Sequence, residues 1–125
     1  MKKTILIVED EKSLQRILFK KLQQVENWEI LQAFNGQQAL DLIKEQQVDL
    51  ILLDIVMPVM DGLTLLQELK DLGELGNKKV IVLTNSASFE QVFRDNGVKY
   101  LVKSNHTLDD LVKRISNEME EVPNK

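Results

Sequence analysis

The sequence predicts an α/β fold, a doubly wound parallel sheet of five strands built from alternating strands and helices, (βα)5. Two observations predict it. First, short runs rich in Ile, Val and Leu recur at residues 5–8, 50–53, 80–83 and 100–102, as is typical of strands buried on both faces. Second, amphipathic segments separate these runs, and such alternation gives a parallel sheet with helices on both faces.

The first half of the chain predicts two strand–helix units. After the first run, helical spacing predicts a helix whose apolar residues are Leu14, Ile17, Leu18, Leu22 and Val25. Residues 28–33 alternate only in part, which predicts a second strand at an edge of the sheet. The pair Asn35-Gly36 has turn chemistry and precedes a predicted helix over residues 37–46.

The second half predicts three further units. A loop with two breakers, residues 57–62, follows the third apolar run, and leucines at helical spacing then predict a helix that ends near Gly73. Residues 86–95 predict a short helix. Thr107 is the predicted N-cap of the last helix, whose apolar face carries Leu108, Leu111, Val112, Ile115 and Met119.

Length and composition limit the class of protein. A chain of 125 residues is one domain, which we expect over residues 1–121, with a tail at 122–125. The absence of cysteine excludes disulfides and thiolate metal sites. The net charge of -4 argues against direct binding of nucleic acid. No apolar stretch approaches the roughly 20 residues of a membrane span or fits a signal peptide, so we expect a cytoplasmic protein.

Each of the four apolar runs ends in a charged or hydroxyl residue. Glu9 and Asp10 follow the first run, and Asp54, Thr84 and Lys103 follow the others in turn. Because ligands bind beyond the carboxyl ends of parallel strands, we expect these side chains to converge. Each residue alone is explained as a helix start, a turn, a cap or a solvated strand end. Their coincidence on four strands favours a function.

The chemistry that suits this set is phosphoryl transfer to a carboxylate. Asp and Glu act as nucleophiles in aspartyl-phosphate formation, and catalysis is then mostly positioning and neutralisation of charge. Glu9, Asp10 and Asp54 together offer the oxygen ligands that Mg²⁺ prefers. Lys103 supplies a positive charge for the phosphoryl group, and the Thr84 hydroxyl supplies a hydrogen-bond donor.

The chain resembles the receiver domain of two-component response regulators, in the chemotaxis-regulator-like, single-domain form. The matching stretches are residues 5–11, 49–62, 82–84 and 100–103. The stretch 49–62 is the most specific, because an Asp ends an apolar run and is followed by Met-Pro and then Met-Asp-Gly. The resemblance implies a flavodoxin-like sheet with strand order 2-1-3-4-5.

The resemblance also implies a role for each residue at the strand ends. Asp54 would be the phosphoacceptor, and Mg²⁺ would be bound by Glu9, Asp10, Asp54 and the backbone carbonyl of Val56. The donor would be a histidine kinase or a phosphotransfer protein. The chain would be a signalling module that catalyses only its own phosphorylation and dephosphorylation.

Signal output is implied in the same way. Lys103 would pair with the phosphoryl group, Thr84 would turn toward it, and Tyr100 would swing inward. A half-buried aromatic on an edge strand is an equally good interpretation of Tyr100. The face made by the fourth helix, the fifth strand and the fifth helix, residues 86–119, would bind a downstream protein. We expect a monomer or a weak dimer.

Three features depart from the family pattern. Ser104 stands where the family usually has proline after a cis peptide bond. Such a bond before another residue costs about 2.5–4 kcal/mol, so we expect a trans Lys103–Ser104 bond or a strained cis bond. Thr84 and Lys103 are closer in sequence than usual by nearly one helical turn. Asn85 replaces a small residue and either narrows access to Asp54 or hydrogen-bonds a phosphoryl oxygen.

Two other classes of function compete with this one. A receiver-like interaction module that is not phosphorylated is favoured by the departures and opposed by the five polar residues. A phosphatase or flavin protein on the same fold is disfavoured. A haloacid-dehalogenase-type phosphatase needs a second Asp where the chain has Val56, and a flavin site needs a Ser/Thr/Gly-rich loop where residues 9–12 are charged.

Overall fold

A computed structural model of the chain describes residues 2–25, 27–54, 62–73, 79–84, 99–102 and 107–120. The elements in these ranges are β1 (Lys3–Val8), α1 (Lys12–Gln23), β2 (Trp28–Ala33), α2 (Gly36–Glu45), β3 (Leu50–Asp54), α3 (Gly62–Asp71), β4 (Lys79–Thr84), β5 (Lys99–Val102) and α5 (Leu108–Glu120). No helix in this part of the chain is long and apolar enough to cross a membrane. The helix predicted over residues 86–95 and the tail at 122–125 lie outside the described residues.

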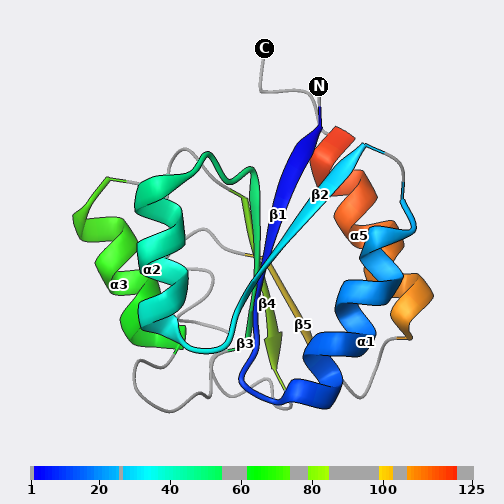
Figure 1. Cartoon of the computed structure of the whole chain (residues 1–125), viewed down its shortest axis with the longest axis horizontal. Coiled ribbons are helices and arrows are strands. Elements are labelled where there is room, and N and C mark those ends of the chain that lie inside the picture. The colour runs from blue at the N-terminus through cyan, green and yellow to red at the C-terminus, as the bar shows by residue number, and fades with distance from the viewer. Residues whose placement is uncertain are drawn as a thin grey trace.

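The five strands form one parallel sheet in the order β2-β1-β3-β4-β5. This confirms the predicted fold class and strand order. It also confirms the edge position that the partial alternation of residues 28–33 predicted, because β2 is the first strand in that order. All strands point toward the lower edge of the sheet in Figure 1, so their carboxyl ends meet there.

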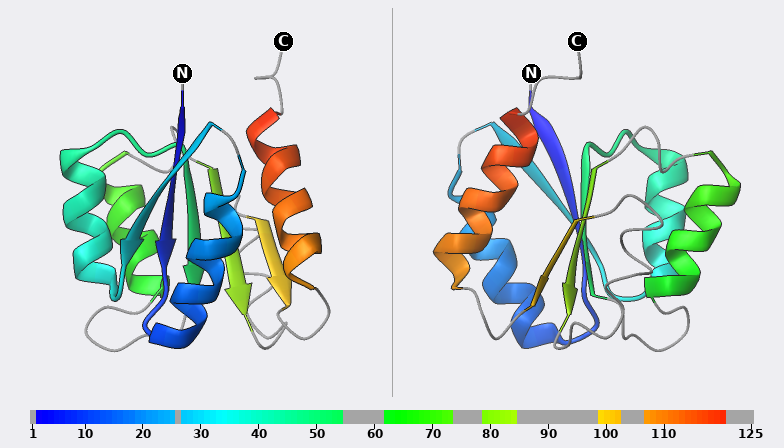
Figure 2. Two further views of the ribbon diagram at one scale, coloured as in Figure 1. Left: turned by 45° about the vertical axis from the view of Figure 1, so that its right-hand side comes forward. Right: turned by 180° about the vertical axis from the view of Figure 1, so that it is seen from behind.

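Helices cover both faces of the sheet. Figures 1 and 2 show α1 and α5 on one face and α2 and α3 on the other. Side chains of β1 alternate between the two layers. Ile5 and Ile7 pack with residues of α1 and α5, whereas Leu6 and Val8 pack with residues of α2 and α3. Both sets are buried, which explains why this strand is a continuous apolar run.

The buried face of α1 differs from the predicted one. Leu18 and Leu22 are buried as expected, but Ile17 is 47% exposed. Successive helix residues point about 100° apart, so when Leu18 and Leu22 face the core centrally, Ile17 lies beyond the margin of the buried stripe. The buried stripe instead includes Gln15, three residues before Leu18.

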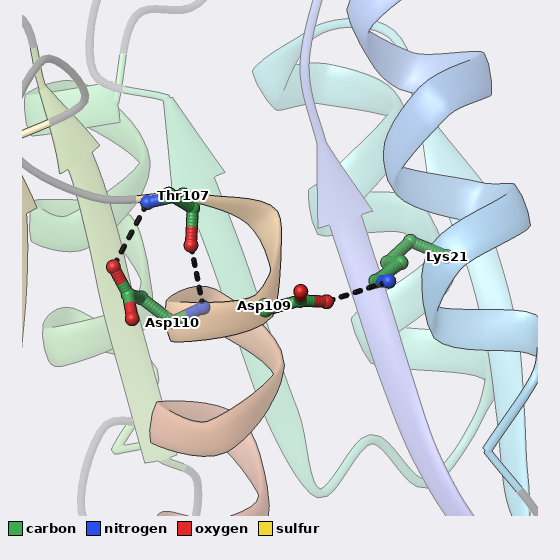
Figure 3. A network of polar contacts seen from close by, with 4 residues as sticks. All are labelled: Lys21, Thr107, Asp109 and Asp110. Carbon is green, nitrogen blue, oxygen red and sulfur yellow. Dashed lines mark hydrogen bonds and ion pairs between the residues drawn. The ribbon is translucent and has the colours of Figure 1, made fainter.

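Polar residues fix several helix ends. Asn35, predicted as part of a turn, is the N-cap of α2, and its side chain accepts a hydrogen bond from the Gln38 N–H at 2.9 Å. Thr107 is confirmed as the cap of α5. Its hydroxyl accepts from the Asp110 N–H at 3.1 Å, while the Asp110 carboxylate accepts from the Thr107 N–H at 3.0 Å (Figure 3). Gly73 follows α3 with a φ of 75°, which glycine adopts at little cost.

Asp49 ties the strands together at the amino edge of the sheet. Its carboxylate accepts from the Thr4 N–H at 2.8 Å, and its own N–H donates to the Thr4 carbonyl at 2.9 Å. Its carbonyl accepts from the Lys79 N–H at 3.2 Å. The Lys79 ammonium in turn donates to the carbonyl of Glu118 on α5. These bonds join β1, β4 and α5 around the residue that precedes β3.

Candidate functional site

The carboxyl edge of the sheet brings the first and third strand ends level with each other. Val8, the last residue of β1, pairs with Leu53 of β3. The next residue on each strand is Glu9 on one side and Asp54 on the other. The register between the two strands ends at this pair, and the two acidic residues that follow it by one position each come from parts of the chain far apart in the sequence.

The same register continues across β4 and β5. Asp54 pairs with Leu83, so Thr84 stands one position farther along β4. Thr84 pairs with Val102, and Lys103 is the next residue in the sequence. The backbone positions of Asp54 and Thr84 thus lie on neighbouring strands at one edge, as the sequence predicted.

Glu9 is held in the turn between β1 and α1. Its N–H donates to the Ala33 carbonyl at 3.1 Å, and one carboxylate oxygen, Oε2, accepts from the Glu11 N–H at 3.1 Å. Glu11 is the N-cap of α1, so the predicted role of an acid at a helix start accounts for part of what Glu9 does. Glu9 is 2% exposed, whereas Asp10 is exposed.

These two carboxylates fit a hard divalent cation. Mg²⁺ takes oxygen ligands and keeps several waters, so one or two carboxylates at an open edge suit it. The Asp54 and Thr84 side chains, together with Val56 and Lys103, lie outside what the structure describes. Among the described residues, no three acidic, histidine or cysteine side chains gather as a metal site.

The predicted switch residue Tyr100 belongs to β5, where it pairs with Val82. In the strand order β5 is an edge strand, which agrees with the structural interpretation of this residue and leaves its switching role a prediction. Asn85, Ser104 and the Lys103–Ser104 bond lie outside the described residues.

Gln15 is a polar residue near this edge that the sequence reasoning missed. Its side chain is buried, and its Nε2 donates to the Ala33 carbonyl at 2.9 Å and the Glu9 carbonyl at 3.1 Å. Its Oε1 accepts from the Gln32 side chain at 3.4 Å. The available signal was its spacing, because Gln15 stands three and seven residues before Leu18 and Leu22 and so shares their side of the helix.

A groove of about 630 Å³ lies beside this cluster, lined by Lys12, Gln15, Arg16, Phe19, Gln32, Phe34 and Gln38. In the described part of the chain, neither of its two cationic side chains forms an ion pair. The groove therefore presents positive charge and aromatic surface next to β2, in a protein whose net charge is -4.

Comparison with protein families and curated proteins gives a consistent result. The model of the response regulator receiver domain matches residues 5–116. Sporulation initiation phosphotransferase F of Bacillus subtilis is 37% identical over 92 residues, covering 74% of this chain and 72% of that protein. The polar-differentiation response regulator DivK of Brucella anthropi is 42% identical over 84 residues, covering 67% and 68%.

Solved structures agree with these sequence matches. The response regulator TrrA of Thermotoga maritima, solved in complex with Mg²⁺-BeF, has 32% identity and a TM-score of 0.78, covering 92% of this chain and 97% of its own. A CheY-like receiver domain protein from Methanospirillum hungatei has 28% identity and a TM-score of 0.84, covering 96% and 95%.

Proposed function

Because the chain belongs to the response regulator receiver family, we propose that it accepts a phosphoryl group on the Asp54 carboxylate. The observation that carries this proposal is the strand register: Glu9 and Asp54 each follow the pair Val8–Leu53 by one position, and Thr84 belongs to the strand that pairs with Asp54. The donor is the phosphohistidine of a histidine kinase or of a phosphotransfer protein, and a role in phosphoryl transfer is supported by the similarity to a sporulation initiation phosphotransferase of Bacillus subtilis.

The reaction is a transfer of one phosphoryl group between two proteins. A carboxylate oxygen of Asp54 forms a bond to phosphorus as the bond to the donor's imidazole nitrogen breaks, and the electron pair returns to that nitrogen. The transition state spreads negative charge over three phosphoryl oxygens. Lys103 neutralises part of this charge, and the Thr84 hydroxyl donates a hydrogen bond to it.

Mg²⁺ would be held by Glu9, Asp10, Asp54 and the backbone carbonyl of Val56. When bound, the ion supplies positive charge beside the transferring oxygens. The buried Glu9 carboxylate is fixed through its bond to the Glu11 N–H, whereas the exposed Asp10 would supply a second, solvent-accessible carboxylate oxygen. The chain's own part is to orient these oxygens before the donor arrives.

Phosphorylation then alters the surface that a partner binds. The phosphoryl group adds about 1.5–2 negative charges and three acceptor oxygens, which is enough to bias a two-state element. Thr84 turns toward the new group and Tyr100 moves inward with it. The responding face lies within residues 86–119 and binds a downstream protein in the cytoplasm, without direct contact to nucleic acid. The module acts as a monomer or weak dimer and catalyses only its own phosphorylation and dephosphorylation.

The test is incubation of the full chain with acetyl phosphate and Mg²⁺, followed by intact mass measurement. We expect a single phosphoryl adduct that disappears with Asp54→Asn or with EDTA. Asp49→Asn is the matched control, because it makes the same change before the same strand and leaves the carboxyl edge intact. An adduct that survives Asp54→Asn would contradict the assignment.

A receiver-like module that is not phosphorylated is the second candidate. Ser104 in place of the usual proline and the shorter sequence between Thr84 and Lys103 favour it. This candidate predicts no adduct from acetyl phosphate and no Mg²⁺-dependent response to beryllofluoride, while a partner still binds. Beryllofluoride separates the two candidates because it mimics the phosphoryl group without a donor.

A further inference from the structure

We propose that Gln15 is a positioning residue for the metal site: its buried amide fixes the peptide that joins Glu9 to Asp10, and so sets the affinity for Mg²⁺. This inference rests on the proposed function, since it concerns the metal that the proposed phosphorylation requires. Gln15 would not touch the ion. It would act through the backbone of the two residues that do.

The amide of Gln15 is committed to the carboxyl ends of two strands. The side chain is 1% exposed. Its Nε2 lies 2.9 Å from the Ala33 carbonyl and 3.1 Å from the Glu9 carbonyl, both within the normal range of a hydrogen bond. The Ile7 carbonyl is farther away, at 3.4 Å. The two N–H groups of this amide are therefore used by the ends of β1 and β2.

The bond to the Glu9 carbonyl has a direct consequence for Asp10. That oxygen belongs to the peptide unit that links the two residues, and a peptide unit is planar. Fixing the oxygen fixes the plane, and the plane sets the direction in which the chain continues to Asp10. One bond from α1 thus orients the backbone of both predicted metal ligands.

Three of the hydrogen bonds among the described residues hold this turn, and Gln15 supplies one from outside it that a mutation can remove. In the first, the Glu9 N–H donates to the Ala33 carbonyl, and both groups belong to the main chain. In the second, the Glu11 N–H donates to the carboxylate of Glu9, which is itself a proposed metal ligand. The third is the Gln15 side chain. Changing Gln15 therefore alters the support of the site without changing any ligand.

The acceptor end of the amide is also engaged. Gln15 Oε1 accepts from Gln32 Nε2 at 3.4 Å. A donor therefore faces the oxygen and carbonyl acceptors face the nitrogen, so the two ends are not interchangeable. A side chain of the same length without an N–H, as in Gln15→Met, keeps the volume and loses every one of these bonds.

The test measures Mg²⁺ binding to the full chain by titration calorimetry, without a phosphoryl donor. We expect Gln15→Met to raise the dissociation constant about tenfold, as is usual when a group that orients a metal ligand is removed. Asp49→Ala is the control, because it removes a comparable side-chain bond at the opposite edge, and its dissociation constant should stay within about twofold of wild type. At saturating Mg²⁺, the rate of adduct formation from acetyl phosphate should return to the wild-type value in Gln15→Met.

The outcomes separate the two proposals. Wild-type protein that binds no Mg²⁺ would contradict the proposed function itself. Wild-type binding with an unchanged dissociation constant in Gln15→Met would overturn the role of Gln15, as would an equal rise in Asp49→Ala, which would show a general effect of stability. If Gln15→Met does not fold, Gln15→Asn repeats the test, because the same amide one methylene shorter no longer reaches the Glu9 carbonyl.

Discussion

Asp49 and Asp54 stand at opposite ends of β3, and the fold uses them differently. Asp49 precedes the strand and spends its N–H, its carbonyl and its carboxylate on bonds to Thr4 and Lys79. Asp54 ends the strand and pairs through its backbone with Leu83, at the edge where Glu9 and Asp10 follow β1. Both residues are aspartates at an end of β3, but they lie at opposite edges of the sheet.

Strand direction explains the difference. The amino ends of parallel strands present N–H groups, and a carboxylate accepts from them, as Asp49 does from Thr4. The carboxyl ends present carbonyls, which need donors, and the Gln15 amide supplies them. At this second edge the Glu9 carboxylate accepts from the Glu11 N–H at the start of α1 and not from a strand end. Asp49 thus supports the sheet at the amino edge, whereas the acidic residues at the carboxyl edge are the ligands of the proposed Mg²⁺ site.

The largest expected effect on stability tests this contrast. Asp49→Ala leaves the partly buried Thr4 N–H without its acceptor, and we expect a loss of about 1–3 kcal/mol in the free energy of unfolding. Asp54→Ala takes one carboxylate away from the edge where Glu9 and Asp10 follow β1, and weaker repulsion among like charges should leave stability unchanged or raise it. Urea unfolding in EDTA measures both.

Asp49→Asn sharpens this comparison, because the amide oxygen still accepts from Thr4 and the loss should be smaller than in Asp49→Ala. Adding Mg²⁺ should stabilise wild type and Asp49→Ala but not Asp54→Ala. A loss in Asp54→Ala as large as in Asp49→Ala would show that both edges are structural, and the contrast between them would fail.

How far the sequence predicts this molecule depends on whether a residue's partner is near it in the chain. Apolar runs and helical spacing predict the sheet, and a cap such as Thr107 is predictable because its partner lies three residues away. The rule that parallel strands end at one edge predicts that Glu9 and Asp54 follow neighbouring strands at the same edge of the sheet. Predicting these features requires only the periodicity of apolar residues and the direction of the strands, and both follow from the sequence.

The tie between Asp49 and Thr4 joins residues 45 positions apart, and it depends on a strand register that periodicity does not give. Gln15 was missed for the same reason, because its acceptors lie on two strands whose pairing is tertiary. Ile17 shows the related error within one helix. Three adjacent apolar residues left the phase of the buried stripe open, and packing chose the face that includes Gln15.

The cap of α5 provides a second, smaller test of a polar residue that serves the fold. Thr107 and Asp110 exchange two hydrogen bonds at the first turn, so Thr107→Ala should lower the free energy of unfolding by about 1 kcal/mol. Thr107→Ser keeps the hydroxyl and should keep most of the stability. Mg²⁺ affinity should not change in either variant. A change in that affinity would mean that the cap of α5 is coupled to the metal ligands and does not serve the fold alone.

The ion pair between Lys21 on α1 and Asp109 on α5 tests how much an acidic residue stabilises the fold through charge alone. Its atoms are 2.7 Å apart, but the two side chains are 35% and 77% exposed (Figure 3). Exposed pairs contribute about 0.2–1 kcal/mol at most, so Lys21→Met should cost a few tenths, far less than Asp49→Ala. A double-mutant cycle with Asp109→Asn, repeated at low and high salt, isolates the pair and should show its small contribution falling as salt screens it. A coupling energy as large as the loss in Asp49→Ala would show that an exposed ion pair stabilises this fold as much as a partly buried hydrogen bond at a strand end does.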